Sequence, residues 1–242
     1  MRLDLYLVDL GLVSSRTEAK GFITSGAVKV DGRIVTKPAF DVTSADVTVD
    51  KSSKKYVSRG GLKLEAALDR FAISPAGRRA IDIGASSGGF TDCLLQRGAL
   101  HVVAVDSGSG QLVDSIRCDS RVTVIENCNA RFLCRKDIEY TPEIAVMDVS
   151  FISATLIIPA VYECLSECAD FICLVKPQFE VGKSGVGKGG IVKSERLRED
   201  ALKRVCECGA AVGFSVLGTM TSPIEGGDGN IEYLVHFRKG NM

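Results

Sequence analysis

The spacing of hydrophobic and polar positions changes along the chain and divides it into two parts. In the first part, leucines recur at three- and four-residue steps over residues 3–11, and a second helical pattern covers residues 14–26. Apolar and polar residues then alternate over residues 27–35 around Asp31 and Gly32, a dipeptide suited to a two-residue type I′ turn. We therefore predict two helices and a hairpin at the start of the chain.

Beyond residue 60, short apolar runs alternate with amphipathic helical segments, a pattern typical of a parallel sheet covered on both faces. A helix over 194–209 and two further strand-like runs close the chain. We predict a Rossmann-like α/β sheet, parallel with a terminal antiparallel hairpin, after a small α+β domain. The five apolar runs that carry this prediction are residues 80–84, 101–106, 122–126, 144–150 and 171–176.

Residues 51–60, KSSKKYVSRG, are polar and contain glycine and serine, so they form a credible linker. We predict one domain with its linker over residues 1–60 and a second over 61–242. The first 60 residues carry 10 Lys and Arg against 7 Asp and Glu, whereas the remainder carries 20 against 23. This asymmetry indicates a basic front module that can meet a polyanion.

The bulk composition is that of a soluble globular protein, with 242 residues, 45% hydrophobic and 25% charged. Its apolar runs fall short of the roughly 18 residues of a membrane span, and the N-terminus alternates charges with leucines, unlike a signal peptide. Nine cysteines without a repeated C-x-x-C pair, and only two histidines, argue against structural zinc. We predict a cytoplasmic, metal-free monomer with reduced thiols.

The most informative run is DIGASSGGFTD, residues 82–92, which follows a strand and opens a helix. Doubly wound sheets bind ligands at such a turn, where glycines let backbone amides approach the ligand. The G-x-x-x-G-G spacing differs from the pyrophosphate-binding G-x-G-x-x-G, and this favours a nucleoside without a diphosphate. Asp106 ends the second strand, where a carboxylate accepts hydrogen bonds from ribose hydroxyls. The alternative is a tight strand-to-helix turn without a ligand.

A second glycine-rich run, VGKSGVGKGG at residues 181–190, matches G-x-x-x-x-G-K through Gly182, Gly187 and Lys188. A phosphate-binding P-loop needs Ser or Thr next, to hold Mg²⁺, but Gly189 follows. The run also lies well past a strand end. We reject the nucleotidase interpretation and expect a glycine-rich loop beside the active site.

Three charged residues interrupt apolar strand segments: Asp148, Lys176 and Glu232. The carboxyl ends of parallel strands gather catalytic groups, and a partly desolvated lysine there can act as a base that a nearby aspartate orients. The alternatives are a structural ion pair at the rim of the sheet for Asp148 and Lys176, and a strand-edge position for Glu232.

Lys63 lies in SRGGLKLEAALDRF, residues 58–71, which reads as a short helix. It sits beside the apolar stripe of that helix. The hydrophobic periodicity is therefore compatible with a solvent-exposed lysine on the flank of the helix and with a functional lysine. The stripe consists of Leu64, Ala67, Leu68 and Phe71.

These motifs together resemble the FtsJ-like 2′-O-methyltransferases over residues 61–242, and the whole chain is similar to the TlyA family, also called hemolysin A, which methylates ribosomal RNA. The resemblance rests on YVSRGGLKL, DIGASSGGFTD, VMDVSFIS, LVKPQFEVG and GNIEYL, in that order. It implies S-adenosylmethionine as the cofactor and ribosomal RNA or ribosomal subunits as the partner. It also implies a cytidine in 23S, and in some members 16S, rRNA as the target.

The resemblance places the family's Lys-Asp-Lys-Glu catalytic set on Lys63, Asp148, Lys176 and Glu232. In that mechanism Lys176 is the base or oxyanion stabiliser, Asp148 and Glu232 tune its charge, and Lys63 orients the hydroxyl. The resemblance places the cofactor site on Asp82, Gly84, Ala85, Ser86, Ser87, Gly88, Gly89, Phe90, Asp106, Asn129 and Asp148.

Residues 1–50 resemble a small RNA-binding module named after a ribosomal small-subunit protein. That similarity places Arg2, Arg16 and Lys37 against RNA phosphates, with Lys20 and Lys29 beside them. Phosphate contacts would position the enzyme, and RNA shape would supply most of the recognition. The alternative for any one of these residues is surface charge that keeps the protein in solution.

Two other function classes stay open at this point. A ribosome-assembly or RNA-binding factor with a vestigial cofactor pocket would keep the same motifs but fail to bind S-adenosylmethionine. A pore-forming hemolysin is suggested by the family's second name, but the chain shows no membrane-spanning run. A pseudouridine synthase would share the front module, but its chemistry does not suit a glycine-rich nucleoside loop in a doubly wound sheet.

Overall fold

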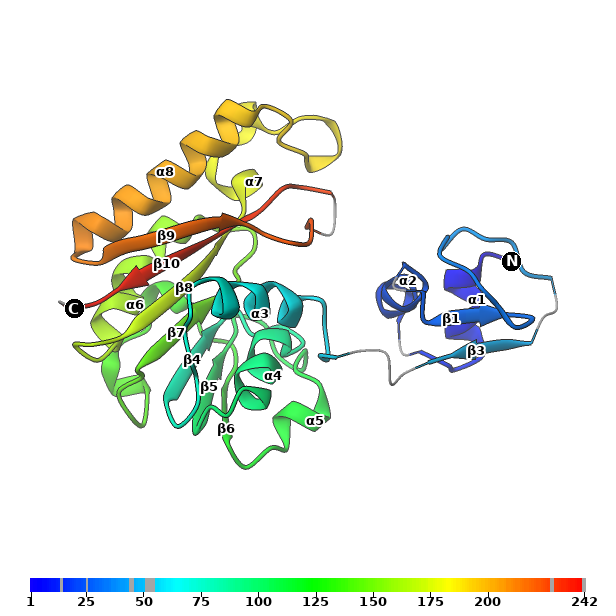
Figure 1. Cartoon of the computed structure of the whole chain (residues 1–242), viewed down its shortest axis with the longest axis horizontal. Coiled ribbons are helices and arrows are strands. Elements are labelled where there is room, and N and C mark those ends of the chain that lie inside the picture. The colour runs from blue at the N-terminus through cyan, green and yellow to red at the C-terminus, as the bar shows by residue number, and fades with distance from the viewer. Residues whose placement is uncertain (14, 25, 44–45, 51–54, 227–228, 241–242) are drawn as a thin grey trace. The chain divides into compact units, whose positions relative to one another are not determined.

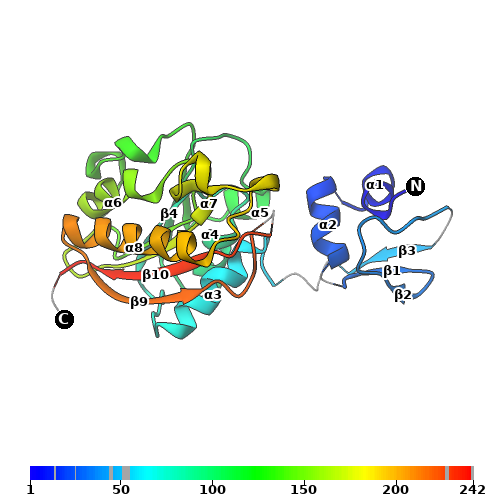
Figure 2. The same cartoon turned by 90° about the horizontal axis from the view of Figure 1, so that it is seen from above.

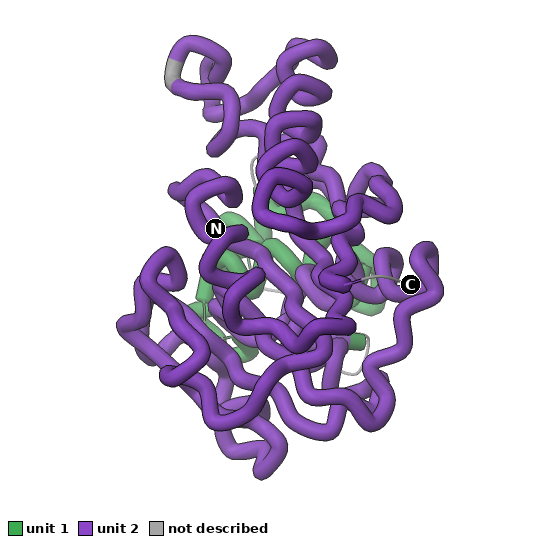
Figure 3. The backbone as a smooth tube through the Cα atoms, turned by 90° about the vertical axis from the view of Figure 1, so that its left-hand side faces the viewer, with its two compact units in different colours: residues 1–55 green, residues 56–242 purple. Residues whose placement is uncertain are grey.

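The computed structural model describes residues 1–13, 15–24, 26–43, 46–50, 55–226 and 229–240. The chain forms two compact units, Met1–Lys55 and Tyr56–Met242, which Figure 3 colours separately. Residues 51–54 of the predicted linker lie outside the described residues.

The first unit packs two helices, α1 (Leu3–Asp9) and α2 (Arg16–Thr24), with a small antiparallel sheet. Asp31 and Gly32 connect the first two strands with φ values of 48° and 76°. Positive φ at both central residues is what a type I′ turn requires, so the predicted hairpin is confirmed. The sheet has the order β2-β1-β3, with β1 at Val28–Val30, β2 at Arg33–Ile34 and β3 at Val47–Val49, a strand that the pattern did not predict.

The second unit is built on a seven-stranded sheet with the order β6-β5-β4-β7-β8-β10-β9 (Figure 1). Strands β4 to β8 run parallel, whereas β10 is antiparallel to both β8 and β9. The predicted fold class, a parallel sheet with a terminal antiparallel hairpin, is therefore confirmed. The strands are β4 (Arg79–Ile83), β5 (His101–Val105), β6 (Val122–Ile125), β7 (Ile144–Met147), β8 (Asp170–Val175), β9 (Ser215–Thr221) and β10 (Tyr233–Arg238).

Helices cover both faces of this sheet, as Figures 1 and 2 show. Alternate side chains of a strand point to opposite faces. In β4, Ala80 accordingly joins the core beneath one layer of helices, and Ile81 joins the core beneath the other. The first layer holds α3 (Gly60–Arg70), α4 (Gly89–Gln96) and α5 (Asp114–Arg117), and the second holds α6 (Ile158–Cys164) and α8 (Glu195–Val212).

The predicted strand over residues 144–150 is shorter in the structure. The apolar run over 144–150 is a strand only to Met147, and the residues after it form a loop at the edge of the sheet. The segment after that loop contains a 3₁₀ turn, Ala154–Leu156, before α6 begins with Pro159 in its first turn. Proline suits the start of a helix because it lacks an N–H to donate.

Among the described residues, no helix has the length and apolar character needed to cross a membrane.

Candidate active site

Four candidate residues each follow directly after a parallel strand. Gly84 follows β4, Asp106 follows β5, Asp148 follows β7, and Lys176 follows β8. Because the carboxyl ends of parallel strands meet at one edge of the sheet, these residues gather there. The sheet thus brings together groups that are up to 92 positions apart in the chain.

The turn after β4 requires glycine at its first position. Gly84 has φ +83°, and a Cβ built on it would lie 2.4 Å from the backbone oxygen of Asp148. The backbone N–H groups of Gly84 and Ala85 both donate to the Val105 carbonyl, at 2.8 and 3.1 Å. Gly88, with φ +97°, is the N-cap residue directly before α4. Glycine therefore lets the loop pass close against the end of β7 while remaining tied to β5.

Asp106 holds this loop in place. Its Oδ2 accepts from the Ser86 backbone N–H at 2.8 Å, and its Oδ1 accepts from the Gly108 backbone N–H at 2.7 Å. Ser86 Oγ also donates to Gln111 Oε1 at 3.3 Å. A carboxylate oxygen has more than one acceptor site, so the half-buried Asp106 retains capacity for hydroxyl donors.

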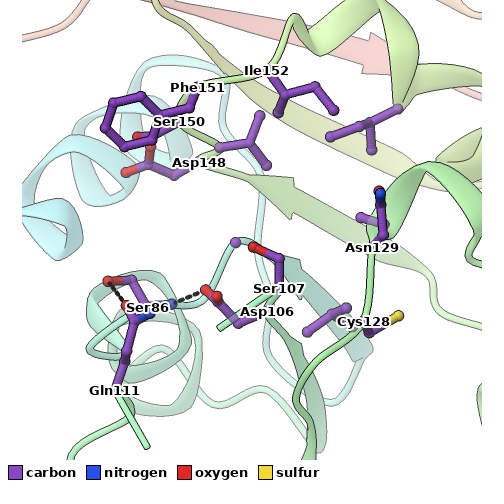
Figure 4. A pocket seen from close by; sticks show the side chains of 15 residues that line it. Ser86, Asp106, Ser107, Gln111, Cys128, Asn129, Asp148, Ser150, Phe151 and Ile152 are labelled. Carbon is purple, nitrogen blue, oxygen red and sulfur yellow. Dashed lines mark hydrogen bonds between the residues drawn. The ribbon is translucent and has the colours of Figure 1, made fainter. Parts of the chain in front are cut away.

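A cavity of about 430 Å³ lies beside the loop (Figure 4). Figure 4 shows Asp148, Ser150 and Phe151 along one wall, with Ser86 and Asp106 across from them. The cavity also includes residues that the motifs did not single out: Ser107, Gln111, Cys128, Ser150, Phe151 and Ile152. The predicted cofactor residues that line it are Gly84, Ser86, Asp106, Asn129 and Asp148.

A second cavity of about 260 Å³ contains both candidate lysines, Lys63 and Lys176. Of the residues that the structure describes, four line both cavities, so the two spaces share a wall. The shared residues are Gly84, Ser86, Asp148 and Ser150. The remaining lining of the smaller cavity is Ser58, Arg59, Gly60, Ala85, Ser87, Gly89 and Phe90.

Lys63 pairs with Glu232 across the fold. Its Nζ lies 2.5 Å from Glu232 Oε2, and the two side chains are only 10% and 2% exposed. The solvated-flank alternative for Lys63 is therefore wrong. A charge buried this deeply needs a partner, and Glu232 supplies it.

Lys176 forms the second lysine–carboxylate pair. Its Nζ lies 2.6 Å from Asp148 Oδ1 and donates a hydrogen bond to Ser150 Oγ at 2.8 Å. Its side chain is 13% exposed and faces the smaller cavity. The structure thus brings three of the four candidate catalytic residues, Lys63, Asp148 and Lys176, to that cavity, with Glu232 held behind Lys63.

Asp82 and Gly88 line neither cavity. Asp82 is fully buried in β4, where its Oδ2 accepts from Thr91 Oγ1 at 2.6 Å. Its Oδ1 has no hydrogen-bond partner among the described residues. Burial is the main cause that raises the pKa of Asp82 to about 7, and the nearby Asp148 carboxylate adds to the effect.

The loop that carries Phe151 has an unusual conformation. Phe151 has φ +65° and is 92% exposed, with its ring 5.2 Å from that of Phe179. Glu180 fixes the far end of the loop by accepting from Ser153 Oγ at 2.5 Å and from the Ala154 N–H at 2.8 Å. Burial raises the pKa of Glu180. Phe151 therefore combines a left-handed backbone conformation with an exposed aromatic side chain, next to the residues that line the larger cavity.

The glycine-rich run at 181–190 is not a P-loop. It forms two short 3₁₀ turns, at Lys183–Gly185 and Lys188–Gly190, and no α-helix starts in the described residues between 181 and 194. The buried side chain of Asn230 fastens the run by accepting from the Val192 N–H at 3.0 Å and donating to the Gly190 carbonyl at 2.9 Å. The loop is thereby tied to the segment that carries Glu232.

In the first unit, the candidate RNA contacts are at the surface. Arg2 and Arg16 both reach the buried Asp4, with Nε–carboxylate distances of 2.9 and 2.8 Å. Hydrogen bonds from the two guanidinium groups hold the pKa of Asp4 far below its usual range. Each arginine side chain stays nearly half exposed, and the other candidates, Lys20, Lys29 and Lys37, are exposed.

Comparison with known proteins extends these observations. The FtsJ-like methyltransferase family matches residues 56–239, and the S4 domain family matches residues 1–47. The chain is 46% identical to the Mycobacterium tuberculosis 16S/23S rRNA (cytidine-2′-O)-methyltransferase TlyA, covering 98% of this chain and 89% of that protein. It is 32% identical to the Campylobacter jejuni 23S rRNA (cytidine-2′-O)-methyltransferase TlyA, covering 99% and 100%.

A solved structure from Streptococcus thermophilus, titled as a hemolysin, superposes with a TM-score of 0.80 at 42% identity. The superposition covers 100% of this chain and 89% of that one. Both the sequence and the arrangement of the elements thus match along the whole length. The chain belongs to the TlyA family of FtsJ-like methyltransferases, with an S4 domain in front of the methyltransferase domain.

Proposed function

We propose that the protein transfers a methyl group from S-adenosylmethionine to the ribose 2′-hydroxyl of a cytidine in 23S ribosomal RNA. The observation that carries the proposal is the shared wall between the two cavities. One cavity has the glycine turn and carboxylate suited to a nucleoside, and the other contains two lysines, each paired with a carboxylate. Both relatives described above carry 23S rRNA in their names.

The residues of the larger cavity fit S-adenosylmethionine. Gly84 lets the loop pack against the Asp148 backbone and line the cavity, and Asp106 can accept from ribose hydroxyls. Asn129 lines the same cavity and can contact an adenine edge. When bound, this cofactor supplies a methyl group on a sulfonium that is already electrophilic, and the carbon–sulfur electron pair stays with sulfur.

Because the electrophile is already activated, the protein's work is to place the acceptor hydroxyl and remove its proton. Lys176 takes that proton through its amine, and Asp148, 2.6 Å away, stabilises the ammonium so formed. Lys63 donates to the 2′-oxygen and so orients it. Glu232 fixes the Lys63 side chain from behind, through the 2.5 Å pair.

The first unit supplies affinity for RNA rather than chemistry. Arg2 and Arg16, gathered by Asp4, present two guanidinium groups on one surface, an arrangement suited to phosphate oxygens. Contacts of this kind position the enzyme, and they weaken as salt concentration rises.

The decisive variant is Lys176→Ala, assayed for methyl transfer to ribosomal RNA and for S-adenosylmethionine binding by calorimetry. We expect methyl transfer to fall to background while the dissociation constant of the cofactor changes less than about threefold. Lys203→Ala is the matched control. Lys203 is an exposed lysine on α8 whose Nζ lies 3.7 Å from Glu207 Oε1, one helical turn away. Substantial turnover by the Lys176 variant would overturn the assignment.

The target nucleotide is tested by mass mapping of 23S and 16S rRNA from cells with and without the gene. We expect one 2′-O-methylated cytidine in 23S rRNA to disappear with the gene. Loss of a 16S methylation alone would contradict the 23S assignment. Failure of the purified protein to bind S-adenosylmethionine, even with RNA present, would favour a non-catalytic RNA-binding role.

A further inference from the structure

Ser150 is placed where the two cavities meet. It lies two residues after Asp148, in the loop that follows β7, and it is one of the four described residues that line both spaces. In Figure 4 it lies next to Asp148 on the wall of the larger cavity. Its hydroxyl accepts the hydrogen bond from Lys176 Nζ at 2.8 Å.

We propose that Ser150 is a positioning residue for methyl transfer, acting through Lys176. The inference rests on the proposed function. It adds a fifth member, a neutral hydroxyl, to the two lysine–carboxylate pairs at the smaller cavity.

The reason lies in the hydrogen-bonding capacity of the lysine. A neutral amine has two N–H groups and one lone pair. The Asp148 carboxylate and the Ser150 hydroxyl lie within reach of the two N–H groups, at 2.6 and 2.8 Å. The hydrogen bond to Ser150 and the ion pair with Asp148 together restrict rotation of the amine, so its lone pair can be directed at a 2′-hydroxyl in the smaller cavity.

The same two partners serve after the proton has moved. The amine forms a new N–H bond with the hydroxyl proton, and the oxygen keeps the electron pair with which it bonds to the methyl carbon. The resulting ammonium keeps its ion pair with Asp148 and its hydrogen bond to Ser150, so the lysine does not have to reorient during the step. Without Ser150 the amine can rotate about its terminal carbon–nitrogen bond, and the fraction of productive orientations falls.

A cofactor-binding role for Ser150 is the competing explanation, because the residue also lines the larger cavity. The two roles predict different kinetics. A positioning role lowers kcat and leaves the KM for S-adenosylmethionine unchanged, whereas a cofactor contact raises that KM.

The experiment compares Ser150→Ala and Ser150→Thr with the wild type, using full-length protein and purified ribosomal RNA substrate. We expect Ser150→Ala to lower kcat by about 10- to 100-fold, with both KM values within about twofold of the wild type. Ser150→Thr keeps the hydroxyl and should recover most of the rate. Ser120→Ala, at an exposed serine before β6 and thus at the opposite edge of the sheet, is the matched control.

The outcomes separate the two proposals. If the wild type methylates RNA but Ser150→Ala matches its kcat, or raises only the KM for the cofactor, the positioning role is overturned and the proposed function stands. If Ser150→Thr is as slow as Ser150→Ala, the hydroxyl is not what matters and the role is also overturned. If the wild type transfers no methyl group to RNA, the proposed function fails and the role of Ser150 falls with it.

Discussion

Lys63 and Glu232 are 169 positions apart in the chain, yet they form a buried ion pair of 2.5 Å beside the smaller cavity. Lys63 lies in the first turn of α3, and Glu232 is the residue directly before β10. The pair therefore joins the first helix of the methyltransferase unit to its last strand. Its removal should affect both stability and activity.

We expect Glu232→Ala to lower the free energy of unfolding by about 3–5 kcal/mol, because it leaves a buried ammonium without a partner. Replacing both residues, Lys63→Met with Glu232→Leu, should restore most of this stability, since no buried charge remains. Neither protein should transfer methyl groups. Urea denaturation and a methyl-transfer assay measure the two effects, and an active double variant would contradict a working role for the pair.

The buried carboxyl of Asp82 should make stability depend on pH. Its pKa is raised to about 7, so between pH 4 and pH 7 the folded protein holds a proton that the unfolded chain has lost. Stability therefore falls as pH rises through this window, by about 4 kcal/mol in all at about 1.36 kcal/mol per pKa unit.

Asp82→Asn tests this effect, because asparagine keeps an acceptor for the Thr91 hydroxyl but carries no charge. Urea denaturation at pH 5 and pH 8 should show that the free energy of unfolding of the variant, relative to that of the wild type, is higher at pH 8 than at pH 5. An equal difference at the two pH values would mean that Asp82 does not titrate in this range.

The fold followed from the sequence because its signals are local. Alternation around Asp31 and Gly32 requires only neighbouring residues, and the apolar runs of the parallel strands are each continuous. Strand β3 escaped prediction because its three residues, Val47–Val49, stand among polar ones and gain strand character only by pairing with β1. Short strands of this kind are defined by tertiary contacts rather than by pattern.

The site was harder to predict, because its residues meet only through the sheet. Periodicity placed Lys63 beside an apolar stripe, and nothing local distinguishes a buried lysine there from a solvated one. The distinction depends on Glu232, which the fold brings from the other end of the unit. Phe151 was not predicted as a site residue for a related reason, since no local sequence pattern indicates its positive φ or its exposure.

Phe151 should bind RNA by stacking. Phe151 is 92% exposed, lines the larger cavity and lies beside Phe179, and base–aromatic stacking contributes about 1–3 kcal/mol. Phe151→Ala should therefore raise the KM for RNA by about 5- to 150-fold. Leu100→Ala, at an exposed apolar residue before β5, is the control. Equal KM values for the Phe151 variant and the wild type would rule out the stacking contact.

Asn230 should control how firmly the glycine-rich run at 181–190 is held. Its buried amide makes two hydrogen bonds to the backbone, at Gly190 and Val192, and Asn230→Ala leaves both groups without their partner. The local cost is about 1–3 kcal/mol, enough to open the loop more often. Limited trypsin digestion should then cut faster after Lys188, an exposed residue of the run.

Two comparisons make the Asn230 digestion specific to the loop. Asn230→Asp keeps the acceptor for the Val192 N–H but loses the donor to the Gly190 carbonyl, so its cleavage rate should fall between those of the wild type and the alanine variant. Cleavage after Lys203, inside α8, serves as the internal reference and should not change. If both sites accelerate together, the substitution has destabilised the whole unit, and Asn230 does not hold the loop separately.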